Sequence, residues 1–526
     1  MAQRISELSR RRLLASGAAA SAVAIAGCTG GSSDDGNELL FTQEKGWAYA
    51  FDPIVANGVP TAQVNEQIYE GLYTYNEDAT DIVPELADGE PEVSDDGVTW
   101  TAEIKDEATF QNGDDVTAED VKYSFEAPVD EETENAAEVN MIESIEAIDD
   151  KTVEFNLEYP YAAFDTTLTW SIVPKSERDG NEEEFGHDPV GSGPLQWVEW
   201  EDGQYVMLER WDDYWGEEQP NISGIEFDFV EEQSTRVTGI ETGESDVIET
   251  VPPQLWEDVE GMDDVTIESS LGIGYFYLAF NCNEGPTADP QVREAVDYAF
   301  SMDDAIGSFV EPAGVRQYSP FPQSIVDAWD FPADEWAEIP HDRDIDQARE
   351  LFEDAGVGMD YEWNIIVPPD DMREAIGESV SNGLQEVGFE NVTFERLEWG
   401  TFLDLYATGS EDDYNMYTLG WSGSPDPEAF TYYLFAQELE ESTNGTYYRN
   451  DEVDQLIMDA REEPDQETRR EMYIEATNTI LEDRVHLPAY NMYNSYGVAD
   501  YVSDFQSHPD SATIPLSTHF NNVDVE

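Results

Sequence analysis

Strand-like and helix-like segments alternate along this chain from residue 39 onward, without a long structureless gap. Asp289-Pro290 provides an N-cap and a first-turn proline before an apolar helical stripe that begins at Val292. Two further helical stripes lie at residues 453–460 and 472–480. Half-buried strands are indicated where apolar and polar side chains alternate, at residues 98–104, 151–157 and 225–229. Together these patterns predict an α/β fold.

The length of the chain indicates more than one structural unit. Its 526 residues are about three times the usual size of a single domain. No repeat of 20–50 residues is visible, which argues against solenoids and propellers. We therefore expect a mixed α/β protein with at least two lobes.

The charge of the chain is extreme, with 119 acidic residues against 23 Lys and Arg, a formal net charge of −96. Such a surface repels phosphate backbones, so nucleic acid is excluded as a partner. Molar salt shortens the Debye length to roughly 3 Å and removes most of the self-repulsion. The composition therefore predicts a protein adapted to concentrated salt, as in a halophile.

The N-terminal segment has the features of an export signal. Arg10 and Arg11 precede two leucines and a mild apolar stretch, which resembles the twin-arginine export motif. Residues 25–28 then resemble a lipobox, in which the Cys28 thiol receives the lipid. We expect a signal at 1–27, a flexible tether at 28–37, and a body lipid-anchored on the outer face of the cytoplasmic membrane.

Signatures of catalysis and of metal binding are missing from the sequence. The five histidines show no metal-ligand spacing, and there is no HExxH, Walker loop or GxGxxG at a helix start. Cys282 has no partner for an intramolecular disulfide and lies in an apolar run, which indicates a buried, inert thiol. Aromatic residues are plentiful, so recognition is favoured over reaction, and neither an enzyme nor a cofactor is expected.

A series of motifs in a fixed order resembles the family-5 extracellular solute-binding proteins, the dipeptide/oligopeptide-binding receptors of ABC importers. The matching segments are 64–75 (VNEQIYEGLYTY), 110–121 (FQNGDDVTAEDV), 189–195 (PVGSGPL), 213–216 (DYWG), 242–246 (TGESD), 292–295 (VREA) and 420–427 (GWSGSPDP). One local prediction is independent of the family: Thr117 and Asp120 form a capping box that begins a helix.

The resemblance implies a two-lobed, periplasmic-binding-protein-like fold of type II, with two hinge crossings and solute enclosed between the lobes. Lobe I would comprise 38–274 and 487–526 with a subdomain at about 60–170, and lobe II would comprise 275–486. The implied partners are a small solute and an ABC permease with its ATPase, and we expect a monomer.

Trp421 stands where the family places a tryptophan that lines the pocket, although a purely structural role is also open. Peptide receptors of the family typically carry an aspartate three residues later, which binds the amino terminus of the peptide. Here that position is Ser424, and Asp426 is the nearest carboxylate. Binding of a free α-amine is therefore an open question.

Two further segments would approach the solute by the same resemblance. The loop after the first strand contributes Glu44, Lys45, Trp47 and Tyr49, and the strand that enters lobe II contributes Tyr275, Tyr277 and Asn281. An oligosaccharide receptor of the same transporter class, a sensory receptor for a membrane transducer and an extracellular hydrolase remain alternatives to a peptide receptor.

Overall fold

The computed structural model describes residues 37–44, 46–47, 51–56 and 58–525. The segments that carry Arg10, Arg11, Cys28, Lys45 and Tyr49 lie outside these residues. No helix in the described part is both long and apolar enough to cross a bilayer.

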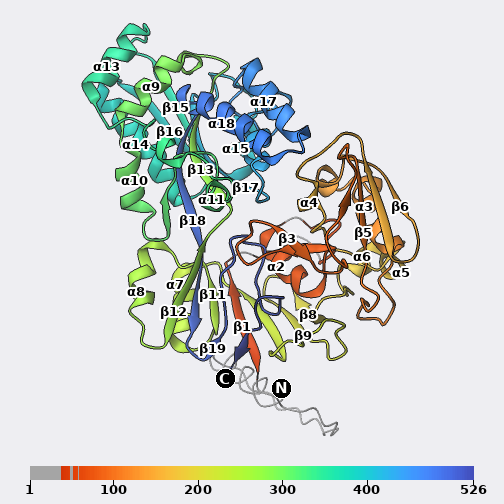
Figure 1. Cartoon of the computed structure of the whole chain (residues 1–526). Helices are drawn as coiled ribbons and strands as arrows, with labels where there is room; N and C mark the ends of the chain where they lie inside the picture. Colours follow the sequence, from red (N-terminus) through yellow and green to blue (C-terminus); the bar gives the residue numbers. More distant parts are fainter. Residues whose placement is uncertain (1–36, 45, 48–50, 57, 526) are drawn as a thin grey trace.

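A twelve-stranded sheet runs through the long axis of the molecule (Figure 1). In spatial order its main path is β16 (Asn391–Arg396), β15 (Glu362–Val367), β17 (Met416–Ser422), β13 (Gly274–Phe280), β18 (His486–Ala499), β11 (Val247–Glu249), β1 (Glu38–Gln43), β10 (Gly224–Phe229), β9 (Tyr205–Arg210) and β8 (Leu195–Glu201). Two more strands, β12 (Val265–Leu271) and β14 (Gly314–Arg316), also pair with β18.

Strand β18 belongs to both lobes. Its first part pairs with β13 and β14 of lobe II, and from Tyr493 onward it pairs with β12 and β11 of lobe I. The short connection between β12 and β13 is the second crossing (Figure 1). The expected two-lobed α/β fold is confirmed, but the change of pairing in β18 lies between Met492 and Tyr493, whereas the sequence-based division has the chain return to lobe I at 487.

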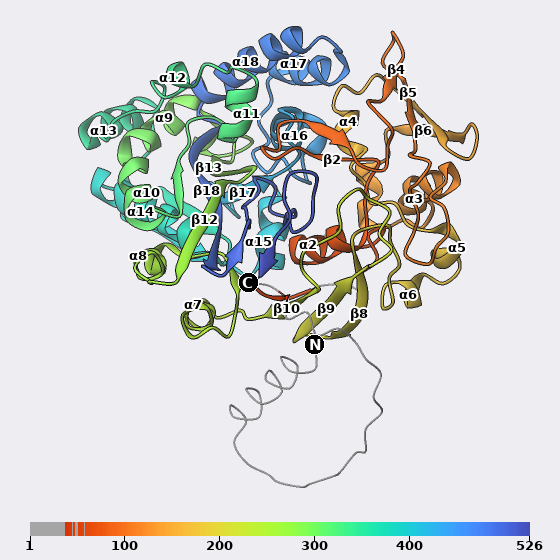
Figure 2. The same cartoon turned by 60° about the horizontal axis from the view of Figure 1, so that its bottom comes forward.

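Helices cover both faces of the lobe II sheet, because its strands present apolar side chains on both sides. On β13, Phe276 and Leu278 enter one core, and Tyr275 and Tyr277 enter the other. The first core is covered by α9 (Pro290–Ala299), α10 (Met302–Phe309), α13 (Ile345–Asp354) and α14 (Asp371–Val387). The second is covered by α11 (Gln323–Ala328), α12 (Ala333–Trp336), α15 (Trp399–Tyr406), α16 (Glu428–Phe435), α17 (Asp451–Glu462) and α18 (Gln466–Glu482) (Figures 1 and 2).

Lobe I packs shorter helices against its half of the sheet. These are α2 (Val59–Ile68), α7 (Gln233–Thr242) and α8 (Trp256–Glu260). Smaller elements complete the two lobes: η2 (Pro253–Leu255), η3 (Pro286–Ala288), η4 (Gln437–Leu439), and the pair β19 (Val502–Ser503) and β20 (Asp524–Val525).

The subdomain lies beside lobe I and has a core of its own (Figures 1 and 2). Its four-stranded sheet follows the order β4 (Glu92–Val93), β5 (Thr99–Glu103), β7 (Thr152–Leu157) and β6 (Ile142–Ala147). The other elements of this region are the hairpin β2 (Tyr73–Tyr75) and β3 (Ile82–Pro84), the helices α3 (Ala118–Asp130), α4 (Phe164–Thr167), α5 (Lys175–Arg178) and α6 (Glu182–Phe185), and the 3-10 helix η1 (Glu134–Glu138).

The local predictions are confirmed where they rest on capping and periodicity. Thr117 and Asp120 form the capping box of α3. The Asp289 carboxylate accepts from the Gln291 amide at 2.9 Å at the start of α9. The three predicted strands are β5, β7 and β10, and the two later stripes are α17 and α18.

Candidate functional site

The carboxyl ends of the parallel strands in both lobes point toward the middle of β18. In lobe II, β15 is parallel to β16 and β17, and the end of β17 pairs with the start of β13 at the crossing. In lobe I, β1 is parallel to β10 and β11, and the end of β11 faces Tyr496 of β18. Because ligands of α/β sheets bind beyond the carboxyl ends of strands, this region is the candidate site.

Trp421 lies at the lobe II edge of this region, at the end of β17. Its indole Nε1 donates to the Ala429 carbonyl at 2.7 Å, and its ring stacks on Tyr433 of α16 with centroids 5.5 Å apart. Ser422 and Gly423 beyond it are exposed, and Ser424 is half-buried. The structure therefore places Trp421 and Ser424 at the edge, with the indole already fixed by its own loop.

The Asp426 carboxylate is bound to Arg469 and to the start of α16. One Arg469 nitrogen lies 2.7 and 2.9 Å from its two carboxylate oxygens, and the Glu428 amide donates to it at 2.8 Å. Both side chains are buried. This carboxylate binds the first amide of α16 and neutralises Arg469, which corrects the prediction that Asp426 is a solute ligand.

The three candidates on β13 and just beyond it are also core residues. Tyr275 and Tyr277 are 0% and 1% exposed and stack on each other with centroids 4.8 Å apart. Asn281 lies past the far end of β13, roughly 20 Å from Tyr275 along the strand, where its side chain bonds the Tyr414 carbonyl and the Asn283 amide. The structure does not bring Asn281 to the site.

On the lobe I edge, Glu44 follows β1. Its amide donates to Glu249 at 3.1 Å, and its carboxylate lies 3.3 Å from the buried Arg236. Trp47 is 7% exposed and packs against Phe51 in the lobe I core. Glu44 is thus at the edge, and Trp47 is mainly a core residue.

Arg373, in the first turn of α14, was not predicted from the sequence. Its guanidinium lies over the rings of Phe276 and Trp399, 5.1 and 5.4 Å from their centroids. Its Nε and Nη1 atoms are buried and have no hydrogen-bond partner among the described residues, and its ion pair with Asp370 is long at 3.8 Å. The only sequence signal was an arginine shortly after a strand in a chain with few cations.

The subdomain forms a side wall by touching lobe II. The Ala162 amide donates to the Arg461 carbonyl at 2.9 Å, and the Tyr161 hydroxyl donates to Glu428 at 3.2 Å. Arg461 pairs with Glu428 at 2.8 Å. Burial raises the pKa of Glu428 to about 7, although Arg461 opposes the shift. Ala79, in the turn between β2 and β3, is also buried in the lobe II core.

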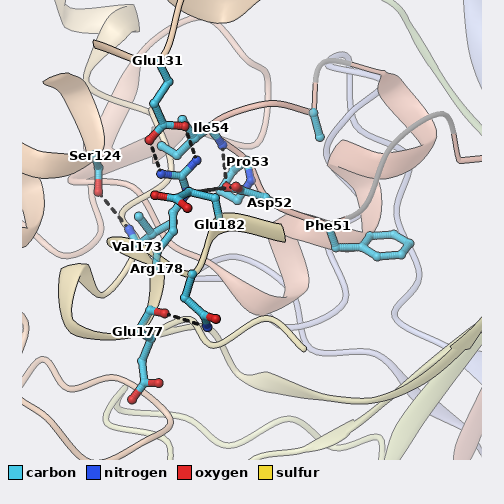
Figure 3. Close-up of polar contacts among 12 residues, drawn as sticks. Phe51, Asp52, Pro53, Ile54, Ser124, Glu131, Val173, Glu177, Arg178 and Glu182 are labelled. Atoms are coloured by element: carbon cyan, nitrogen blue, oxygen red, sulfur yellow. Dashed lines mark hydrogen bonds and ion pairs between the residues drawn. The ribbon is translucent and has the colours of Figure 1, made fainter. Parts of the chain in front are cut away.

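A buried network ties the loop after β1 to the subdomain (Figure 3). Arg178 is fully buried and its Nε donates to both Asp52 oxygens at 3.0 and 2.8 Å, while its other nitrogens donate to Glu131 at 2.6 and 2.8 Å. Nearby, the Asn135 amide donates to the carbonyls of Pro53, Ile54 and Ala56. The Asn135 bonds fix η1 to the loop after β1, and the Arg178 bonds join the same loop to α5 and to the end of α3.

The Cys282 thiol and groups of metal-binding side chains are the remaining features to consider. Burial raises the pKa of the Cys282 thiol to about 11, so it stays protonated at neutral pH. Among the described residues no group of three or more His, Cys, Asp or Glu is arranged to hold a metal ion. A surface cavity of about 670 Å³, lined by Asp360, Glu362 and their neighbours, lies at the opposite end of β15.

Comparison with known proteins finds one matching family and relatives that are named as binding proteins. Residues 81–440 match the model of the bacterial extracellular solute-binding proteins, family 5. The oligopeptide-binding protein AppA of Bacillus subtilis is 24% identical over 87% of this chain and 87% of its own length. The dipeptide-binding protein of Escherichia coli is 25% identical over 95% and 94%.

The fold has solved counterparts. The periplasmic binding protein DppA from Helicobacter pylori, solved with the peptide STSA, superimposes with a TM-score of 0.77 at 24% identity and covers 93% of this chain and 98% of that one. The relatives named here are binding proteins, not enzymes. The chain belongs to family 5 of the bacterial extracellular solute-binding proteins.

Proposed function

We propose that this protein is the receptor of an ABC importer that captures short peptides between its lobes and delivers them to a membrane permease with its ATPase. Relatives that span nearly the whole chain are named for oligopeptides and dipeptides. The solute would lie against the carboxyl ends of the strands described above, where Trp421 and Glu44 approach from the two lobes.

The observation that carries the proposal is the state of Arg373. Arg373 is half-buried and its ion pair with Asp370 is long, so a further carboxylate would stabilise it through charge-assisted hydrogen bonds. The free carboxylate of a peptide supplies such a group at the lobe II edge. Flanking rings of Phe276 and Trp399 would exclude water from the pair.

The test is a thermal-shift screen in molar salt with di- and tripeptides, oligosaccharides and metal chelates. A ligand that binds only the folded state raises its stability by RT ln(1+[L]/Kd). We expect a shift with peptides. A shift with oligosaccharides alone would contradict the proposal, and a pull-down that recovers a transducer instead of a permease would favour the sensory role.

We further propose that the protein is exported by the twin-arginine route, anchored by a lipid at Cys28, and monomeric. The order of the two N-terminal motifs supports export and anchoring, and the acidic composition supports an origin in concentrated salt. Replacement of Arg10 and Arg11 by lysine should leave unprocessed precursor in the cytoplasm. Cys28→Ser should release the body from the membrane fraction, and mass spectrometry of the N-terminus would detect the lipid.

A further inference from the structure

The contact between the subdomain and lobe II bridges the two lobes outside the hinge. The chain passes from lobe to lobe at the β12–β13 connection and within β18. The segment 159–162 of the subdomain lies at neither crossing, yet it reaches α16 and α17 of lobe II. When two lobes move about a hinge, a contact of this kind is made in the closed form and broken in the open form.

Lobe II supplies one half of this contact as a complete unit. Arg461 of α17 donates from Nε to Glu428 at 2.8 Å, and its guanidinium lies 3.5 Å from the ring centroid of Tyr432. Arg461 and Glu428 are 8% and 1% exposed. Because the ion pair lies within one lobe, separating the lobes hydrates it but leaves neither charge without its partner.

The subdomain supplies the other half from neutral groups. The Tyr161 hydroxyl donates to the second oxygen of Glu428 at 3.2 Å, and the Ala162 amide donates to the Arg461 carbonyl at 2.9 Å. The rings of Tyr159 and Tyr161 lie 5.8 and 5.5 Å from the Arg461 guanidinium carbon. Neutral groups exchange such partners for water at little cost, so this contact can form and break reversibly.

The turn between β2 and β3 makes a second contact with lobe II. Ala79 in this turn is 0% exposed and belongs to the lobe II core cluster, against which Tyr75 also packs. The turn is held by its own bonds, since the Ala79 and Thr80 amides donate to the carbonyl and the side chain of Asn76 at 3.0 and 2.9 Å. It therefore keeps its shape without lobe II and can enter that core as a preformed unit.

The lobe II half of the contact is built on the same helical turn as the candidate site. Glu428 is the first residue of α16, and the carbonyl of the next residue, Ala429, accepts from the Trp421 indole at 2.7 Å. Closure of the subdomain onto Glu428 thus acts on the turn that positions Trp421.

We propose that the subdomain is a latch, which docks segment 159–162 and the Ala79 turn on lobe II and favours the closed form before any solute is bound. The inference goes beyond the proposed function, because it concerns the solute-free protein and does not depend on the chemistry of the solute. A receptor whose closed form is already populated binds each solute more tightly, since less of the binding free energy is spent on closure.

The test is hydrogen exchange by mass spectrometry on the full chain without solute, in molar salt, read at segments 160–164 and 76–82. Tyr161→Phe removes the hydroxyl and keeps the ring. Loss of a hydrogen bond to a charged group should lower the closure constant by about 10-fold. We expect both segments to exchange about 10-fold faster, because the same closure protects them.

Tyr448→Phe is the matched control. Tyr448 is as buried as Tyr161, at 6% exposed, and it also donates its hydroxyl to a carboxylate, that of Asp483 at 2.6 Å. Both partners lie in lobe II, so this substitution should leave exchange of the two segments unchanged. Unfolding midpoints close to that of the unmodified protein would show that both variants fold.

Ala79→Asp tests the latch from its other end. In the closed form it would bury a carboxylate in the lobe II core, whereas the open form leaves that group in water. It should accelerate exchange at 160–164, a segment of the chain about 80 residues away, by at least as much as Tyr161→Phe does.

Unchanged exchange of both segments in Tyr161→Phe would overturn the latch. Acceleration confined to the segment next to the substitution, in Tyr161→Phe or in Ala79→Asp, would overturn it as well, because the effect would then be local loosening. Equal acceleration in Tyr448→Phe would assign the effect to general destabilisation. No peptide is present in these measurements, so failure of the proposed function would leave their outcome unaffected.

Discussion

One nitrogen of Arg469 lies 2.7 and 2.9 Å from the two carboxylate oxygens of Asp426, and both side chains are buried. Removing one partner of a buried pair leaves an uncompensated charge, which costs about 3–5 kcal/mol. Asp426→Asn should therefore lower the free energy of unfolding by about that amount, measured by denaturant titration. Asp459→Asn, an exposed carboxylate on α17, is the control. A fully stable Asp426→Asn with lost solute affinity would instead make Asp426 a ligand.

Arg373→Met should weaken peptide binding and leave the free energy of unfolding nearly unchanged, the opposite of Asp426→Asn. Because its guanidinium lacks a strong partner, replacing it with an apolar side chain should change the free energy of unfolding by less than about 1 kcal/mol. Peptide affinity should fall about 10- to 100-fold, since a charge-assisted bond to the carboxylate is lost. Arg349→Met on α13, which removes an arginine paired with Asp346, should leave affinity intact. Strong destabilisation without a change in affinity would assign Arg373 to the core.

Two substitutions of Trp421 distinguish its structural role from its role in solute binding. Trp421→Phe keeps a ring against Tyr433 but removes the bond to the Ala429 carbonyl, so stability should drop by about 1 kcal/mol while most affinity remains. Trp421→Ala removes the aromatic surface and should abolish most of the ligand-induced thermal shift. Equal affinities of the two variants would mean that the ring packs and does not bind.

The buried carboxyl of Glu70 predicts a pH dependence of stability. It accepts from the Tyr214 hydroxyl at 2.6 Å and from Trp215 Nε1 at 3.0 Å, and burial raises its pKa from 4.5 to about 7. A raised pKa means that the folded state holds the proton more tightly, so the contribution of Glu70 to stability is complete below pH 4.5 and is lost as the pH rises from 4.5 through about 7. The loss amounts to about 3 kcal/mol at most.

Glu70→Gln removes this titration, so its stability relative to the unmodified protein should rise between pH 5 and pH 8. Denaturant titrations at several pH values measure the difference, in which titrating groups far from Glu70 cancel, whereas the charge of Glu70 also raises the pKa of the neighbouring Glu85. Parallel curves for the two proteins would show that Glu70 does not titrate in this range.

The acidic surface predicts a strong salt dependence. With a net charge of −96, repulsion among carboxylates should lower the urea midpoint in dilute buffer. Raising KCl from 0.1 M to above 1 M shortens the Debye length from about 10 to about 3 Å and should raise the midpoint steeply. A midpoint independent of KCl would argue against adaptation to concentrated salt.

Features that depend on neighbouring residues were predictable from the sequence, and those that depend on distant ones were not. The start of α3 was predictable because Thr117 and Asp120 satisfy each other's backbone groups within one turn. The division of β18 between two lobes was not, because alternation identifies a strand but not its partners. Asn281 is predicted at the site because it belongs to the strand that enters lobe II, but β13 carries it away from Tyr275 to the far end of that strand. The absence of a hydrogen-bond partner for Nε and Nη1 of Arg373 among the described residues is a property of the packed protein alone.

The position of β18 also limits when each half of the molecule is complete. This strand lies between β13 and β11, so without it both halves of the sheet have an unpaired edge. Residues 486–499 follow every other strand of this sheet in the chain, so neither lobe can close its sheet until they have been synthesised. Exposed edges and apolar faces persist until then, which makes the nascent chain dependent on chaperones or on its own charge to avoid aggregation.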